Sequence, residues 1–310
     1  MNTPSTAMPQ SSPESGAAAP ATAAKTRPLY WSVRRELWEI RSIYWAPPIV
    51  AGIALVGFAI SAVGLPERRR ALLLLDPAQA RAAVEKPYDI AAMVLILTAF
   101  LVGTFYCLDA LHGERRDRSI LFWKSMPVSD LTTVISKASI PLVVLPAITI
   151  VLIAVTQLAM MLLTDALLLA SGQSASTWAL YPFFDHLAIL LYGLVALTLW
   201  HAPIYGWLLL VSVWARRATF LWAVLPLFAI MILERIGFHT SYFASLLKYR
   251  LIGGVGEAFA VHAQGTHFAL GMPDPDPLKF VASPGLWTGL AVAVGLLVAT
   301  ARLRRYREPL

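Results

Sequence analysis

Six long apolar stretches, separated by polar segments, dominate the pattern of hydrophobic and polar positions along the chain. They cover residues 45–64, 90–108, 138–163, 187–213, 218–233 and 284–301, and none contains Asp, Glu, Lys or Arg. An α-helix needs about 20 apolar residues to cross a hydrocarbon core about 30 Å thick. One charge at its centre would cost about 2.5–3.5 kcal/mol, whereas each Leu or Ile returns only about 0.3–0.6 kcal/mol. The pattern therefore predicts an all-α, polytopic integral membrane protein with six transmembrane helices.

Prolines and charges modify this pattern locally. Pro141, Pro146 and Pro203 lie inside the third and fourth stretches and predict kinks there. The fifth stretch is the shortest, and it ends at Glu234 and Arg235, which we expect to pair or to reach the membrane interface.

The composition excludes an ordinary soluble fold. Of 310 residues, 58% are hydrophobic and only 14% are charged, and the formal net charge is +7. In a soluble chain such a positive charge would suggest nucleic acid as a partner. A bilayer explains it better, so we expect membrane lipid and no nucleic acid. The single cysteine, Cys107, lies in an apolar stretch and is interpreted as a small core residue.

The distribution of Lys and Arg predicts the orientation. With the N-terminus inside, most of the 25 basic residues lie in cytoplasmic segments, as the positive-inside rule requires. Both termini are therefore expected in the cytoplasm (N-in/C-in) of a protein of the inner (cytoplasmic) membrane. The triplet Arg68 to Arg70, which would lie outside, conflicts with the rule.

Two segments precede the first span. Residues 1–28 are rich in Ala, Pro, Ser and Thr, which predicts a disordered cytoplasmic tail. Residues 29–44 have apolar positions at spacings of three and four with a basic opposite face, which predicts an amphipathic helix on the inner leaflet. The alternative is that this helix extends the first span and packs on other helices. Residues 45–310 are predicted to form the six-span transmembrane domain.

The loop of residues 109–137, between spans two and three, carries the most information. Alternating charges in residues 114–118 precede a bulky apolar run, and Pro127 then interrupts it. We expect a short helix, a break, and a second helix that Ser129 or Asp130 caps and that continues into span three. The alternative is a solvated basic loop that only sets the orientation.

The external segment, residues 236–283, gives weaker signals. Residues 242–251 suggest an interfacial or re-entrant helix, and the prolines of 272–277 argue against a helix there. His262 and His267 are too few for a metal site. His201, inside span four, is interpreted as a hydrogen-bonded packing residue in preference to a proton relay. Asp109 is expected either to pair with Arg115 or Arg116 or to be solvated.

The words ERRDRSILFWKSMPVSDL, residues 114–131, resemble the loop of bacterial permeases of the type-two, ABCG-like class of ATP-binding-cassette (ABC) transporters. The helix before span one and the long external segment between spans five and six also resemble that family. The resemblance covers most of the chain in layout and about thirty residues in detail. It implies an exporter subunit that dimerises with an identical or different permease and docks a separate cytoplasmic ATPase subunit.

In that family, residues 109–137 would be the coupling loop and residues 29–44 the connecting helix. The resemblance implies these partner-binding residues: Glu114, Arg115, Arg116, Asp117 and Lys124 against the ATPase, with Pro127 and Ser129 fixing the turn. ATP and Mg²⁺ would bind the partner, because the chain has no GxxxxGK[ST] loop. No cofactor, metal or enzymatic activity is expected on this chain.

Two other functions stay open. An intramembrane enzyme would need groups such as HExxH or GxSxG, which the chain lacks. A secondary transporter would need ionisable groups within the spans, for which His201 alone gives thin support. The sequence does not indicate the substrate.

Overall fold

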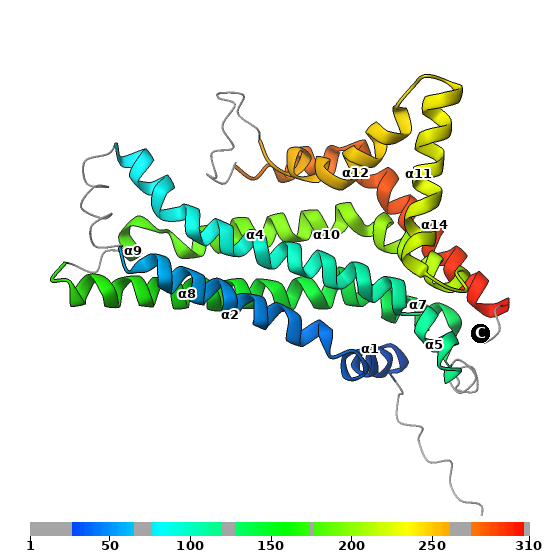
Figure 1. Cartoon of the computed structure of the whole chain (residues 1–310), viewed down its shortest axis with the longest axis horizontal. Coiled ribbons are helices and arrows are strands. Elements are labelled where there is room, and N and C mark those ends of the chain that lie inside the picture. The colour runs from blue at the N-terminus through cyan, green and yellow to red at the C-terminus, as the bar shows by residue number, and fades with distance from the viewer. Residues whose placement is uncertain (1–26, 65–75, 120–127, 174–176, 261–273, 307–310) are drawn as a thin grey trace, which may run out of the picture.

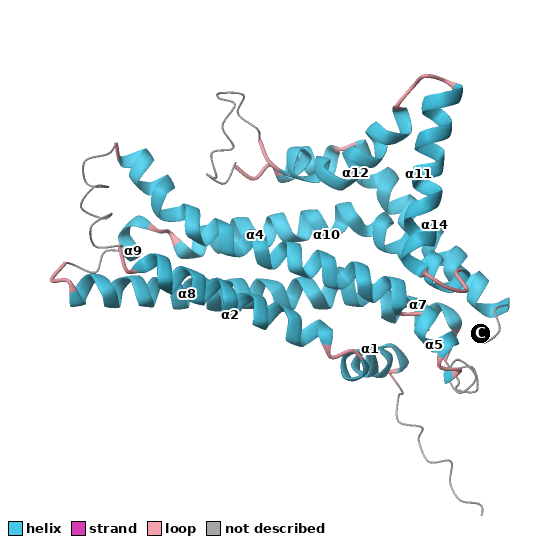
Figure 2. Ribbon diagram, viewed as in Figure 1, coloured by secondary structure: helices cyan, strands magenta, loops and turns pink. Residues whose placement is uncertain are grey.

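A computed structural model describes residues 27–64, 76–119, 128–173, 177–260 and 274–306, and within them the chain is helical apart from turns and one bridge between Phe259 and Pro275 (Figure 2). The helices are α1 (Pro28–Glu39), α2 (Ser42–Ala62), α4 (Pro77–Asp109), α5 (His112–Arg116), α7 (Asp130–Ser139), η1 (Ile140–Val144), α8 (Leu145–Ala170), α9 (Thr177–Leu180), α10 (Phe183–Trp214), α11 (Thr219–Gly237), α12 (Tyr242–Ala258), α13 (Pro277–Ala282) and α14 (Pro284–Tyr306).

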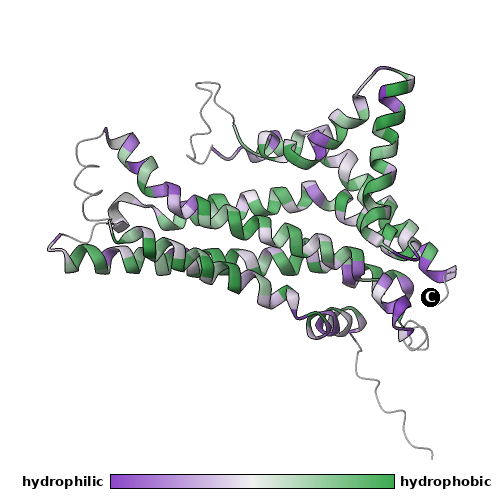
Figure 3. Cartoon of the chain, in the orientation of Figure 1, coloured by the Kyte–Doolittle hydropathy of each residue, from purple (hydrophilic) through white to green (hydrophobic). Residues whose placement is uncertain are grey.

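The long helices α2, α4, α8 and α10 form an elongated bundle, and α14 packs along α10 (Figure 1). Six helical segments of the described chain are long and apolar enough to cross a membrane. Hydrophobic residues cover their middle parts, whereas hydrophilic residues gather at the end formed by α1, α5 and the end of α14 (Figure 3). The prediction of an all-helical chain with six helices able to span a membrane is therefore confirmed for the described residues, and α1 and the end of α14 lie at the same end of the bundle.

The helices extend beyond several predicted spans. α4 begins at Pro77, thirteen residues before the predicted second span. The third span is part of a rod that runs through α7, η1 and α8 from Asp130 to Ala170. Pro141 lies in η1, a π-helical turn, so the predicted irregularity is present. The residues that extend these helices beyond the apolar stretches are polar or charged, so hydropathy alone does not detect the extensions.

The predicted helix of residues 29–44 is two helices. α1 ends at Glu39, Ile40 is extended with φ −111° and ψ 92°, and α2 begins at Ser42. The turn lets α1 leave the axis of α2 and pack Val33, Leu37 and Ile40 against the main core. This packing agrees with the alternative of a helix docked on its neighbours, although the helix does not continue span one without a break.

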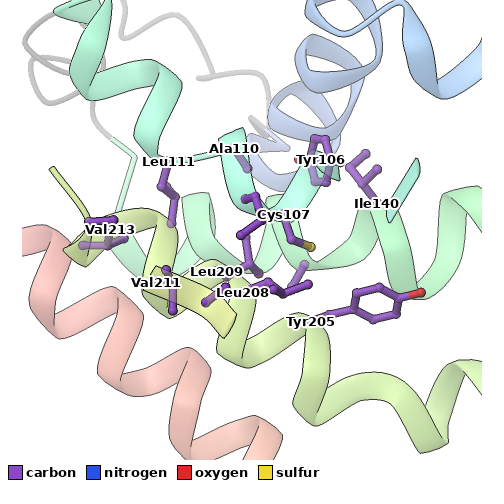
Figure 4. Close-up of a cluster of buried hydrophobic side chains, with 14 of the residues drawn as sticks. Tyr106, Cys107, Ala110, Leu111, Ile140, Tyr205, Leu208, Leu209, Val211 and Val213 are labelled. Carbon is purple, nitrogen blue, oxygen red and sulfur yellow. The ribbon is translucent and has the colours of Figure 1, made fainter. Parts of the chain in front are cut away.

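The main core lies between α4, the start of the third span and α10. Cys107 is fully buried there, among Ile140, Leu208 and Leu209 (Figure 4). Its interpretation as a core residue is confirmed.

The link from α11 to α12 depends on Glu234. Its carboxylate accepts hydrogen bonds from the backbone N–H of Tyr242 (2.6 Å) and Phe243 (2.9 Å), which are free donors in the first turn of α12. Glu234 therefore orients α12, and no ion pair with Arg235 is recorded among the described residues.

α12 packs on the middle of α10. An added Cβ on Gly254 would lie 2.8 Å from the ring of Trp200, so only glycine allows this approach. Arg250 stacks on the same ring and donates to the carbonyl oxygens of Trp200 (3.3 Å) and Gly285 (2.8 Å). Through these contacts α12 turns back toward the middle of the bundle, as the predicted re-entrant helix would.

Several predictions lie outside the described residues. These are the tail up to residue 26, the triplet Arg68 to Arg70, Lys124, Pro127, His262 and His267. Of the proline-rich segment, Asp274 to Asp276 are not helical, but Pro277 is the first residue of α13, where proline is well tolerated.

Candidate functional site

A cluster of charged side chains joins four helices at the hydrophilic end of the bundle. We call Arg35, Glu36, Glu114, Asp130, Lys137 and Arg304 the charge cluster. Its centre is Lys137, whose side chain is 2% exposed. The Lys137 Nζ atom lies 2.9 and 3.1 Å from the two carboxylate oxygens of Glu36 and 3.1 Å from Glu114 Oε1.

Glu114, on α5, has three cationic partners. Besides Lys137, its carboxylate receives Arg35 at 2.9 Å and Arg304 at 3.2 Å. Arg304 also bonds Asp130, at the start of α7. Glu114 therefore connects the segment that follows span two to α1, α7 and α14.

The cluster is electrically balanced. Its three cations face three carboxylates, and Tyr106 on α4 donates a further hydrogen bond of 2.9 Å to Glu36. Burial lowers the pKa of Arg35, but the neighbouring Glu36 and Glu114 outweigh burial and raise it overall. Removing one partner of such a buried pair costs about 3–5 kcal/mol, because the other charge is left uncompensated. The cluster therefore locks these helices to one another.

A second set of contacts fixes α5 to the end of α10. The backbone N–H groups of Leu111 and His112 donate to Ser212 Oγ at 3.0 and 2.9 Å. The guanidinium of Arg115, 3% exposed, donates to the carbonyl oxygens of Val213 (2.7 Å) and Ala215 (3.2 Å). These carbonyls are at the C-terminus of α10, where a positive charge also favours the helix dipole.

The predicted partner-binding residues therefore divide into two groups. Glu114 and Arg115 are buried in contacts within the chain, so neither presents its charge to a partner in this arrangement. Arg116 and Asp117 have side chains 58% and 64% exposed, and Arg116 pairs with Asp109 at 3.8 Å as expected. Ser129 caps α7 by accepting the N–H of Thr132 at 3.1 Å, which confirms the predicted start of that helix.

Of the charge cluster, the sequence predicted only Glu114 as a site residue. It missed the other members and the tyrosine that bonds them, which are Arg35, Glu36, Asp130, Lys137, Arg304 and Tyr106. One signal was available for Glu36: it falls between Val33, Leu37 and Ile40, within the apolar stripe of its helix. A carboxylate in such a stripe needs a buried partner. For the others no local signal exists, because their partners lie far along the chain.

A second buried pair of ionisable side chains lies away from the charge cluster. Asp89 on α4 and His186 on α10 are 5–6% exposed, with the carboxylate and Nε2 3.0 Å apart. Tyr181 stacks on Tyr88 beside them, and burial raises the pKa of its hydroxyl far above the usual range.

Metal binding has no candidate within the described ranges, where no three His, Cys, Asp or Glu side chains form a suitable group. Comparisons with models of known protein families, with curated proteins and with solved structures found no match.

Proposed function

We propose that this chain is the permease subunit of an ABC exporter of the type-two class, in the cytoplasmic membrane with both termini inside. ATP would be hydrolysed by a separate cytoplasmic ATPase subunit, and two permeases would form the transport unit. The hydrophilic end of the bundle would face the cytoplasm and the ATPase.

One observation carries the proposal: the segment predicted as the coupling loop is bound to several helices at once. Glu114 joins α5 to α1, α7 and α14, and Arg115 joins it to α10. A solvated loop that only set the orientation would not need buried ion pairs, which are costly to desolvate. A segment that transmits force from a partner needs such rigid attachment.

The experiment is co-purification with candidate ATPases that contain a phosphate-binding loop, beginning with any that is encoded next to this gene. Arg116 and Arg118 are exposed at the end of α5, so Arg116→Glu with Arg118→Glu reverses two charges on the proposed docking surface. We expect the affinity for the ATPase to fall about tenfold or more, since like charges at an interface repel.

The matched control reverses two exposed charges at the same end, Arg302→Glu with Arg305→Glu on α14. It should leave the complex intact, and both variants should insert in the membrane as the unchanged protein does. The docking surface would be refuted if both double variants lost equal affinity for the ATPase, or if the complex survived charge reversal at Arg116 and Arg118.

The Asp89–His186 pair favours a second candidate, a proton-coupled secondary transporter, because buried ionisable groups are the elements such transporters use. Transport in ATP-depleted vesicles that follows a proton gradient and is lost in Asp89→Asn would establish it. Transport that requires ATP and survives Asp89→Asn would exclude it.

A further inference from the structure

An apolar pocket of about 290 Å³ lies between α4, η1 with the start of α8, α10 and α12. Aliphatic and aromatic side chains such as Leu97, Phe100, Leu145 and Leu194 form most of its wall, and no Asp, Glu, Lys or Arg lines it. A cavity of about 150 Å³ is enough to hold benzene. The pocket therefore has room for a molecule of roughly twice that size.

Three lining residues carry polar side-chain atoms, and two are already engaged. Thr198 donates to the carbonyl oxygen of Leu194 at 2.7 Å. The two ring nitrogens of His201 face the carbonyl oxygens of Leu197 (2.8 Å) and Leu251 (3.1 Å), which confirms it as a hydrogen-bonded packing residue. The hydroxyl proton of Thr198 is therefore engaged within α10, and the ring of His201 is engaged both within α10 and with α12.

The hydroxyl of Tyr205 is the polar group that remains. Tyr205 is 6% exposed, and in the part of the chain that the structure describes its hydroxyl has no hydrogen-bond partner. Figure 4 shows the hydroxyl pointing away from the packed side chains of the core. The hydroxyl oxygen is not among the fully buried unpaired atoms, so it can be reached from the pocket, and a hydrogen bond from it to a ligand oxygen would contribute about 0.5–1.5 kcal/mol.

The mouth of the pocket indicates how a ligand enters. Met93 and Leu97 line the pocket from α4 and are 56% and 55% exposed. Both lie within the apolar stretch 90–108, so the opening faces the hydrocarbon part of a bilayer. A charged ligand is excluded, because nothing in the wall would compensate its charge.

The wall of the pocket also includes Pro141 of η1. An added Cβ on Gly103 would lie 3.3 Å from both Pro141 and Tyr205, so a glycine lets α4 approach the π-helical turn. Such turns are rare and occur frequently at functional sites.

We propose that this pocket binds a lipophilic molecule that enters from the bilayer and carries one uncharged hydroxyl or carbonyl oxygen, which bonds the Tyr205 hydroxyl. Binding itself does not require an ATPase. That this molecule is the cargo rests on the proposed exporter function.

The test uses two photoreactive probes, a diazirine-bearing decanol and the corresponding decane without the hydroxyl. The purified permease, in phosphatidylcholine vesicles and without an ATPase, is irradiated and its labelled peptides are mapped by mass spectrometry. We expect the decanol probe to label α4 and α10 and unlabelled decanol to compete. Tyr205→Phe should weaken decanol binding about 3- to 10-fold, as loss of one hydrogen bond predicts, and leave the decane probe unaffected.

A matched pair of variants tests the location. Leu97 lines the pocket and Leu101, one turn away, does not, although both are about half exposed on α4. Leu97→Trp should abolish labelling and Leu101→Trp should preserve it. If both probes label the pocket equally and Tyr205→Phe changes nothing, a lipid acyl chain fills it and the proposal is wrong. If the decanol probe binds but no ATPase docks, only the proposed exporter function is wrong. If an ATPase docks but the probe does not bind, only the proposed ligand pocket is wrong.

Discussion

Replacing Lys137 with Met removes the ammonium that two buried carboxylates share, while keeping a side chain of similar length. Lys137 lies 2.9–3.1 Å from Glu36 and Glu114, and all three side chains are at most 3% exposed. The variant would leave three carboxylates against the guanidinium groups of Arg35 and Arg304, a net charge of −1. We expect the free energy of unfolding to fall by about 3–5 kcal/mol.

The assay is unfolding of the purified protein by a denaturing detergent, followed by circular dichroism and tryptophan fluorescence. Lys248→Met, at an exposed position of α12, is the control and should change the free energy of unfolding by less than about 0.5 kcal/mol. Adding Glu36→Gln to Lys137→Met restores neutrality, so the double variant should lose less stability than the sum of the two single variants.

Two outcomes would refute this reasoning. The charge cluster is not a lock if Lys137→Met unfolds at the same detergent concentration as Lys248→Met. It is not one network if the effects of Lys137→Met and Glu36→Gln simply add.

Two further predictions concern single contacts. Ser129→Ala removes the cap of α7 and should cost about 1 kcal/mol in unfolding free energy, whereas Ser129→Asn, another good cap, should retain most of it. Gly254→Ala should lower the free energy of unfolding by about 1–3 kcal/mol, because its Cβ would meet the buried ring of Trp200. Gly256→Ala, with open space around its Cβ, should be neutral or stabilising. Equal effects of the two variants in the same unfolding assay would contradict the close approach of α12 to α10.

The six spans could be predicted from sequence because each is a continuous run of apolar residues, a signal that depends on neither partners nor distance. The ends of the corresponding helices could not be predicted in the same way. α4 continues back to Pro77 through residues that include Arg81 and Glu85, which hydropathy excludes although they suit a helix. The break after Glu39 has no Gly or Pro to mark it, since the packing of α1 on the bundle determines it.

The charge cluster shows a different limit. Ser129 could be predicted as a cap because a cap and its helix are adjacent in sequence. Glu36 and Lys137 are 101 positions apart, and Glu114 and Arg304 are 190 apart. A single sequence indicates that such charges exist but not which of them meet. Glu114 and Arg115 therefore looked like surface residues of a basic loop, although both are buried.

The attachments of α5 also constrain how a force on it can reach the proposed ligand pocket. α4 leads directly into α5, Lys137 ties α7 to Glu114, and Ser212 with Arg115 ties α10 to it. Moving α5 alone would separate buried charges at a cost of several kcal/mol, so these three walls should move as one body. Among the described walls of the pocket, α12 is the one without such a contact to α5. It is held instead to the middle of α10, through Trp200, His201 and Arg250. We therefore expect any opening of the pocket that depends on the partner to occur between α12 and the other three.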